Sequence, residues 1–109
     1  MKIAILNSGE HEQVLFDIVK NLKCIATKEE LLKNGFTNYN KPIIYYCKSL
    51  NKKHDITFSI EVSANNLEIK EILILDENFM QPYFVNKEYN EKIKAIIDDL
   101  IDKKLFEKG

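Results

Sequence analysis

The chain has 109 residues, 45% hydrophobic and 30% charged, which is enough apolar material for the core of one domain spanning residues 1–109. It contains no run of 18 apolar residues that could span a membrane and no signal-peptide pattern at its start, so we expect a cytoplasmic protein. All 16 basic residues are lysines and the formal net charge is −1, which argues against nucleic-acid binding, since that uses arginine forks and a concentrated positive patch.

The N-terminal third of the sequence predicts a strand and two helices. Residues 2–6 are a short apolar run that ends at turn-forming residues, as a strand does. Between residues 10 and 23 the apolar positions recur at helical spacing, which predicts an amphipathic helix. Thr27 to Glu30 has the sequence of a capping box, and Gly35 stands where a left-handed residue ends a helix, so a second, shorter helix lies between them.

The middle of the sequence predicts an antiparallel sheet. A β-rich run at residues 43–47 precedes the strict polar–apolar alternation of residues 55–63, which is typical of a strand with one buried and one solvated face. A tight turn at residues 64–66 leads to a returning strand at 67–75. The apolar phase of this strand shifts near Lys70, which indicates either a β-bulge or burial of both faces further on.

The C-terminal part combines an aromatic loop with a long helix. The loop covers residues 76–85, and the helix runs from about 87 to 106 with a stripe of isoleucine and leucine. The predicted fold is therefore α+β: a three- to four-stranded, mainly antiparallel sheet with two or three helices packed on one face, including this long C-terminal amphipathic helix.

Patterns for catalysis and metal binding are weak. The turn Asn7–Glu12 has the outline of a phosphate-binding turn, but it holds one glycine where that motif needs several. His11 and His54 lack metal-ligand spacing, and the apolar surroundings of Cys24 and Cys47 predict buried, reduced thiols. We expect no catalytic residue, no metal and no cofactor; the alternative is a small ligand-binding protein or enzyme that uses Asn7–Glu12.

Charge is distributed unevenly along the chain. Residues 1–54 carry nine lysines and five acidic residues, whereas residues 55–109 carry seven lysines and twelve acidic residues. The acidic excess begins in the predicted hairpin, where alternation puts the polar residues of the first strand on its solvated face. Together with acidic and aromatic residues that follow, they form a predicted partner-binding face: Thr57, Ser59, Glu61, Glu68, Glu71, Asp76, Glu77, Phe79 and Tyr83.

An acidic face flanked by aromatic side chains suits docking on a basic protein, because complementary charge steers association and aromatic anchors supply affinity. The arginine-free, asparagine- and isoleucine-rich composition is typical of a low-GC bacterium or a phage. We therefore expect a small, non-catalytic protein-binding protein, in its specific form an immunity- or antitoxin-type inhibitor of a basic toxin. A merely solvated sheet face would show the same pattern, and the isoleucine-rich last helix could instead pack against its own copy, so the oligomeric state stays open.

Overall fold

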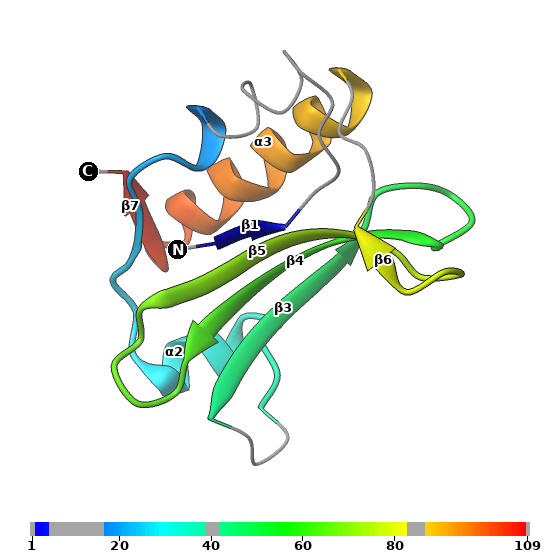
Figure 1. Ribbon diagram of the computed structural model, residues 1–109. Coiled ribbons are helices and arrows are strands. Elements are labelled where there is room, and N and C mark those ends of the chain that lie inside the picture. The colour runs from blue at the N-terminus through cyan, green and yellow to red at the C-terminus, as the bar shows by residue number, and fades with distance from the viewer. Residues whose placement is uncertain (1, 5–16, 39–41, 83–86, 109) are drawn as a thin grey trace.

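The main sheet of the computed structural model has five strands, and a long helix lies along one side of it (Figure 1). The strands are β1 (Lys2–Ala4), β3 (Ile43–Ser49), β4 (Ile56–Ser63), β5 (Ile69–Asp76) and β6 (Gln81–Pro82). The strand order is β1–β5–β4–β3, with β6 on the end of β5. All pairings are antiparallel except that of β1, which joins β5 in parallel. The structure describes residues 2–4, 17–38, 42–82 and 87–108.

Helices α2 (Lys28–Lys33) and α3 (Lys87–Asp102), a short helical segment at residues 17–19 and a two-stranded sheet complete the described fold. The small sheet pairs β2 (Leu22–Cys24) with β7 (Phe106–Lys108) in antiparallel orientation. This architecture confirms the predicted α+β class. Within the described ranges, no helix combines the length and apolar character needed to cross a bilayer.

Two of the predicted helices extend beyond the residues at which the observed helices end. The helical stripe predicts a helix to residue 23, but Asn21 has a left-handed backbone (φ 61°) and the chain then enters β2. Residues 17–19 are helical, and the earlier part of that predicted helix lies outside the described residues. In the same way α3 ends at Asp102, Lys104 takes φ 61°, and Phe106 belongs to β7. The cause is the pairing of β2 with β7, a long-range contact that overrides local periodicity.

The two ends of α2 follow the sequence prediction. The Thr27 hydroxyl accepts a hydrogen bond from the Glu30 backbone N–H at 3.2 Å, and the Glu30 carboxylate accepts one from the Thr27 N–H at 3.0 Å, which completes the capping box. The bond from the Thr27 backbone holds the pKa of the Glu30 carboxyl below its usual value. At the other end Gly35 has φ +91°, the left-handed conformation expected after a helix.

Gly35→Ala should destabilise the domain by about 1–2 kcal/mol, because a side chain at a left-handed position is strained even where there is space. Space is available here: an added Cβ would lie 3.6 Å from the Tyr46 ring. Urea unfolding followed by circular dichroism would measure the change. Lys33→Ala, an exposed helical position in the last turn of α2, serves as the control, and an equal loss in both variants would contradict the role of Gly35.

The core lies between α3 and one face of the sheet, which we call the inner face. The alternate residues of β4 that the sequence predicts to be buried are all on this face and at most 5% exposed: Ile56, Phe58, Ile60 and Val62. Ile93 and Ile97 of α3 are fully buried in the same cluster. Beyond α2, the ring of Phe36 lies 5.0 Å from that of Tyr46 and 5.9 Å from that of Phe106 between centroids, which closes one end of the core.

A β-bulge interrupts the pairing of β4 with β5. Glu61 lies opposite Glu71, but the next residue, Val62, lies opposite Ile69, so Lys70 is the extra residue. The phase shift seen in the sequence is thus the bulge, the first of its two interpretations. The extra residue lets Ile69 pack against the core although it does not follow the alternation of the rest of β5.

Candidate functional site

The strand residues that alternate with the core residues form a second surface, the outer face of the sheet. On this face Tyr45 lies opposite Glu61 and Cys47 lies opposite Ser59. Across β5, Leu73 lies opposite Ser59 and Glu71 opposite Glu61. Figure 1 shows α3 on the other side of the sheet. The outer face consists of Ile43, Tyr45, Cys47, Ser49, Thr57, Ser59, Glu61, Ser63, Glu71, Leu73, Leu75 and, just beyond β5, Glu77.

The structure places the predicted residues of β4 on this face, together with two of the carboxylates that follow. Ser59 and Glu61 are half-buried, while Thr57 is buried at 7% exposure. The Thr57 hydroxyl donates a hydrogen bond of 2.9 Å to the Glu77 carboxylate, so these two side chains hold each other at one end of the face. The surface that alternation predicts to be solvated is therefore only partly exposed.

Two carboxylates stand directly opposite each other in the β4–β5 pair, next to the bulge. Glu61 and Glu71 are cross-strand partners, and both are half-buried. Lys70 is exposed next to them in the bulge, but none of the ion pairs between described residues involves any of the three. Like charges directly opposite destabilise a sheet, so this pair lowers the stability of the fold while it concentrates negative charge on the outer face.

Two other predicted acidic residues lie off the outer face. Asp76 lies opposite Ile56 and is 8% exposed. Its carboxylate accepts hydrogen bonds from the backbone N–H groups of Asn78 at 2.9 Å and Phe79 at 3.4 Å, and so it shapes the turn after β5. Glu68 is exposed in the β4–β5 connection. Neither residue adds its charge to the Glu61–Glu71 pair on the outer face.

An apolar tip projects from the turn between β5 and β6. Phe79 is 72% exposed and the next residue, Met80, is 70% exposed with a left-handed backbone at φ 51°. The sequence predicts Phe79 as a binding residue but passes over Met80, whose exposure depends on the conformation of the turn. Tyr83, the other predicted aromatic residue, lies outside the described residues.

The cysteines depart from the prediction of two buried thiols. Cys47 is exposed on the outer face, whereas Cys24 is half-buried. Burial raises the pKa of the Cys24 thiol. The prediction for Cys47 is wrong because a continuous apolar run, residues 43–47, does not reveal which side chains face the core.

The outer face also has an apolar part, which is absent from the predicted partner-binding residues. Leu73 is the next residue after Glu71 on this face, and Leu75 is the next one along β5; both are only half-buried, as is Tyr45 on the other side of β4. The signal is present in the sequence, because Glu71 alternates in period 2 with these leucines. The face that this alternation belongs to depends on the position of the bulge, because the extra residue Lys70 changes the phase of β5.

The other candidate sites are the turn at residues 7–12 and a metal-binding cluster. The alternative site at Asn7–Glu12 lies outside the described residues, and His11 with it. In the part of the chain that the structure describes, no three histidine, cysteine or acidic side chains gather in a way that could hold a metal ion.

Comparison with known proteins supports the fold. No family model matches the chain, and no curated protein matches it significantly. A solved structure with a similar fold is the crystal structure of a DUF1831 family protein from Lactobacillus plantarum, with a TM-score of 0.61, 16% sequence identity, and coverage of 79% of this chain and 82% of that chain. At this identity the likeness shows a shared fold, and function has to be argued from the side chains of this chain.

Proposed function

We propose that this protein is a small, non-catalytic binding protein that docks the outer face of its sheet on a positively charged protein partner. The observation that carries the proposal is the opposed pair Glu61 and Glu71 beside the accessible leucines Leu73 and Leu75. A cation from a partner would relieve the repulsion between the carboxylates, so part of the interaction energy comes from removing a strain that the free protein carries.

The leucines supply binding affinity that charge alone does not provide. Exposed ion pairs contribute little net affinity, because they are hydrated and screened by salt. Burying the accessible parts of Leu73, Leu75 and Tyr45 removes apolar surface from water and excludes water from the neighbouring carboxylates. The exposed Phe79 at the turn extends the apolar area beyond the strands.

The specific form of the proposal is an immunity- or antitoxin-type inhibitor that acts in the cytoplasm of a bacterium, or is encoded by a phage, and masks a basic toxin. The support is the acidic excess of residues 55–109 and the arginine-free composition. An inhibitor of this type needs a rigid, pre-formed surface, and strands of a sheet provide one because their backbones are held on both sides.

Glu61→Lys tests the docking face. The variant should bind the partner about tenfold more weakly, because an attractive contact becomes repulsive. The domain should stay folded and become slightly more stable, since the like-charge pair with Glu71 becomes an attractive one. The measurement begins with pull-downs from the cells that encode the protein, followed by calorimetric titration of the purified partner.

Glu91→Lys is the matched control, since Glu91 is exposed on α3 and the charge change is the same. A partner retained equally by both variants would show that the outer face is not used. For the specific form, the purified partner should have a toxic enzymatic activity that one equivalent of the protein suppresses. A partner without such activity would leave the docking face supported and refute the inhibitor role.

A further inference from the structure

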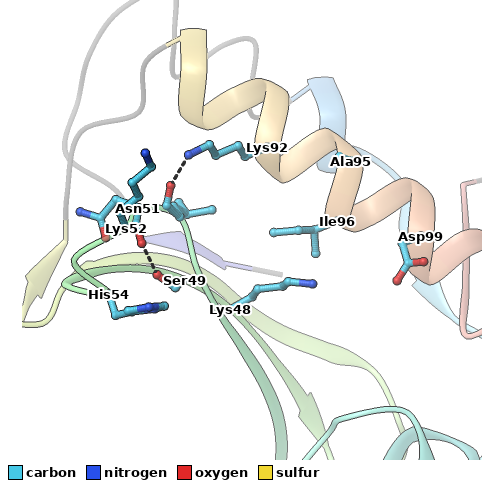
Figure 2. Close-up of a pocket in the computed structure, with 10 residues that line it drawn as sticks. Lys48, Ser49, Asn51, Lys52, His54, Lys92, Ala95, Ile96 and Asp99 are labelled. Atoms are coloured by element: carbon cyan, nitrogen blue, oxygen red, sulfur yellow. Dashed lines mark hydrogen bonds between the residues drawn. The ribbon is translucent and has the colours of Figure 1, made fainter.

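A groove of about 540 Å³ lies between α3 and the loop that joins β3 to β4 (Figure 2). One wall comes from the end of β3 and residues 50–52 and 54, and the other from the middle of α3. This size is within the range of sites that hold small molecules. The groove lies on the side of the sheet that carries α3, away from the outer face, so it is independent of the docking proposal.

The loop wall is held in shape by its own hydrogen bonds. The side-chain oxygen of Asn51 accepts from the backbone N–H groups of Asp55 at 3.2 Å and Ile56 at 3.3 Å, and its amide nitrogen donates to the Asp55 carboxylate. That last bond holds the pKa of Asp55 below its usual value. The Ser49 hydroxyl donates to the Asn51 carbonyl at 2.8 Å. A wall fixed in this way loses little conformational entropy when a ligand binds.

The helix wall is tied to the loop at one point. The ammonium of Lys92 donates to the Leu50 carbonyl at 2.7 Å, as Figure 2 shows, and also pairs with Glu88 at 3.4 Å. Further along the helix, the Asp99 carboxylate pairs with Lys103 at 3.1 Å. The acidic residue of the lining is therefore already compensated by a lysine of its own helix.

The remaining charge of the groove is positive. Lys48 and Lys52 are exposed, and neither takes part in an ion pair between described residues. Figure 2 shows Lys48 extending from the end of β3 toward α3, near Ile96. Since Lys92 and Asp99 are both compensated on α3, these two lysines give the groove a positive charge, although the whole chain has a formal net charge of −1. This local excess favours an anion.

The floor of the groove is apolar. The apolar residues of its lining are Ala95, which is exposed, and Ile96 and Leu50, which are 9% and 1% exposed. An anion without an apolar part, such as inorganic phosphate, would leave this apolar surface exposed to water. A ligand that carries an anionic group on an apolar body would satisfy the lysines and cover the floor together.

We propose that this groove binds a small organic anion, with its carboxylate or phosphate attracted by the lining lysines Lys48, Lys52 and Lys92 and its apolar body on Ala95 and Ile96. Lysine ammonium groups act as point charges and do not select between the two head groups as a planar arginine fork would.

Octyl phosphate is the first probe, titrated into the ¹⁵N-labelled protein and followed by NMR chemical shifts. Saturable shifts should map to residues 48–54 and 92–99. Inorganic phosphate should bind at least about tenfold more weakly, because it has no apolar body. Octylammonium, with the same chain and the opposite charge, should not bind there. Shifts that map elsewhere, or equal binding of octylammonium, would overturn the proposal. If octyl phosphate binds at the groove, a titration with octanoate compares the carboxylate with the phosphate head group at the same site.

The double variant Lys48→Gln with Lys52→Gln should weaken octyl phosphate binding about fivefold or more, by removing two exposed cations that no described ion pair requires. The control double variant Lys70→Gln with Lys94→Gln changes the net charge equally at exposed sites outside the lining and should leave the affinity unchanged. Ala95→Phe, which fills the floor, should abolish binding without altering the charge. Unchanged affinity in the first and third variants, or equal losses in both double variants, would refute the site.

Discussion

Phe58→Ala should lower the free energy of unfolding by about 3–5 kcal/mol, a large part of the total stability of a domain of this size. Phe58 is 0% exposed at the centre of the inner face, on the strand that pairs with both β3 and β5. Removing the ring leaves a cavity that neighbours on two strands and α3 cannot fill, because the sheet fixes their backbones. Urea unfolding, with the slope checked against that of the wild type, would measure the loss.

Ser59→Ala is the matched control, since Ser59 is the next residue on β4 and its side chain is on the outer face. It should change stability by no more than about 0.5 kcal/mol. Similar losses in the two variants would mean that the inner and outer faces have been assigned the wrong way round, and the docking proposal would fail with that assignment.

Deletion of Leu73 should unfold the domain, whereas deletion of Lys70 should be tolerated. Leu73 lies in the regular part of β5, so its loss shifts the remaining strand by one residue and turns the buried Ile74 outward. The bulge could absorb the deletion only by turning Glu71 into the core beside Ile60, which would bury an unpaired charge. We expect a loss of at least about 4 kcal/mol, comparable to the largest effects of single changes.

Lys70 behaves differently because it is the extra residue of the bulge. After its deletion Ile69 stays opposite Val62 and Glu71 stays opposite Glu61, now as consecutive pairs on their original faces. The stability should change by about 1 kcal/mol or less, as judged from thermal unfolding and from the dispersion of amide NMR signals. If deletion of Lys70 unfolded the protein as deletion of Leu73 does, the register of β4 and β5 would be wrong.

The opposed carboxylates are the point at which stability and the proposed function conflict. A sheet selected for stability alone would place a lysine opposite Glu61, since opposite charges at such positions attract. This chain instead pairs Glu61 with Glu71 and puts Lys70 in the bulge. Local rules of this kind are commonly broken at binding sites, where the destabilising group has a use outside the fold.

The sequence by itself determines the elements that depend on neighbours along the chain. The alternation of residues 56–63 separates the inner from the outer side chains of β4, because successive strand residues point to opposite faces. Thr27, Glu30 and Gly35 mark the ends of α2, because capping depends on groups three or four residues apart. The phase shift near Lys70 predicts either a bulge or burial of both faces, and the observed register of β4 and β5 selects the bulge.

Only the tertiary structure decides features that join distant segments. The pairing of β2 with β7 ends two helical stripes early, since backbone hydrogen bonds between segments some 80 residues apart replace local helical ones. The exposure of Cys47 depends on which side of β3 receives α3. Lys48, Lys52 and Lys92 are ordinary surface lysines in the sequence, but they line one groove because packing α3 on the inner face sets it beside the β3–β4 loop. Local patterns follow from covalent geometry within one turn or one strand, whereas these surfaces arise from the burial of apolar area shared by the whole chain.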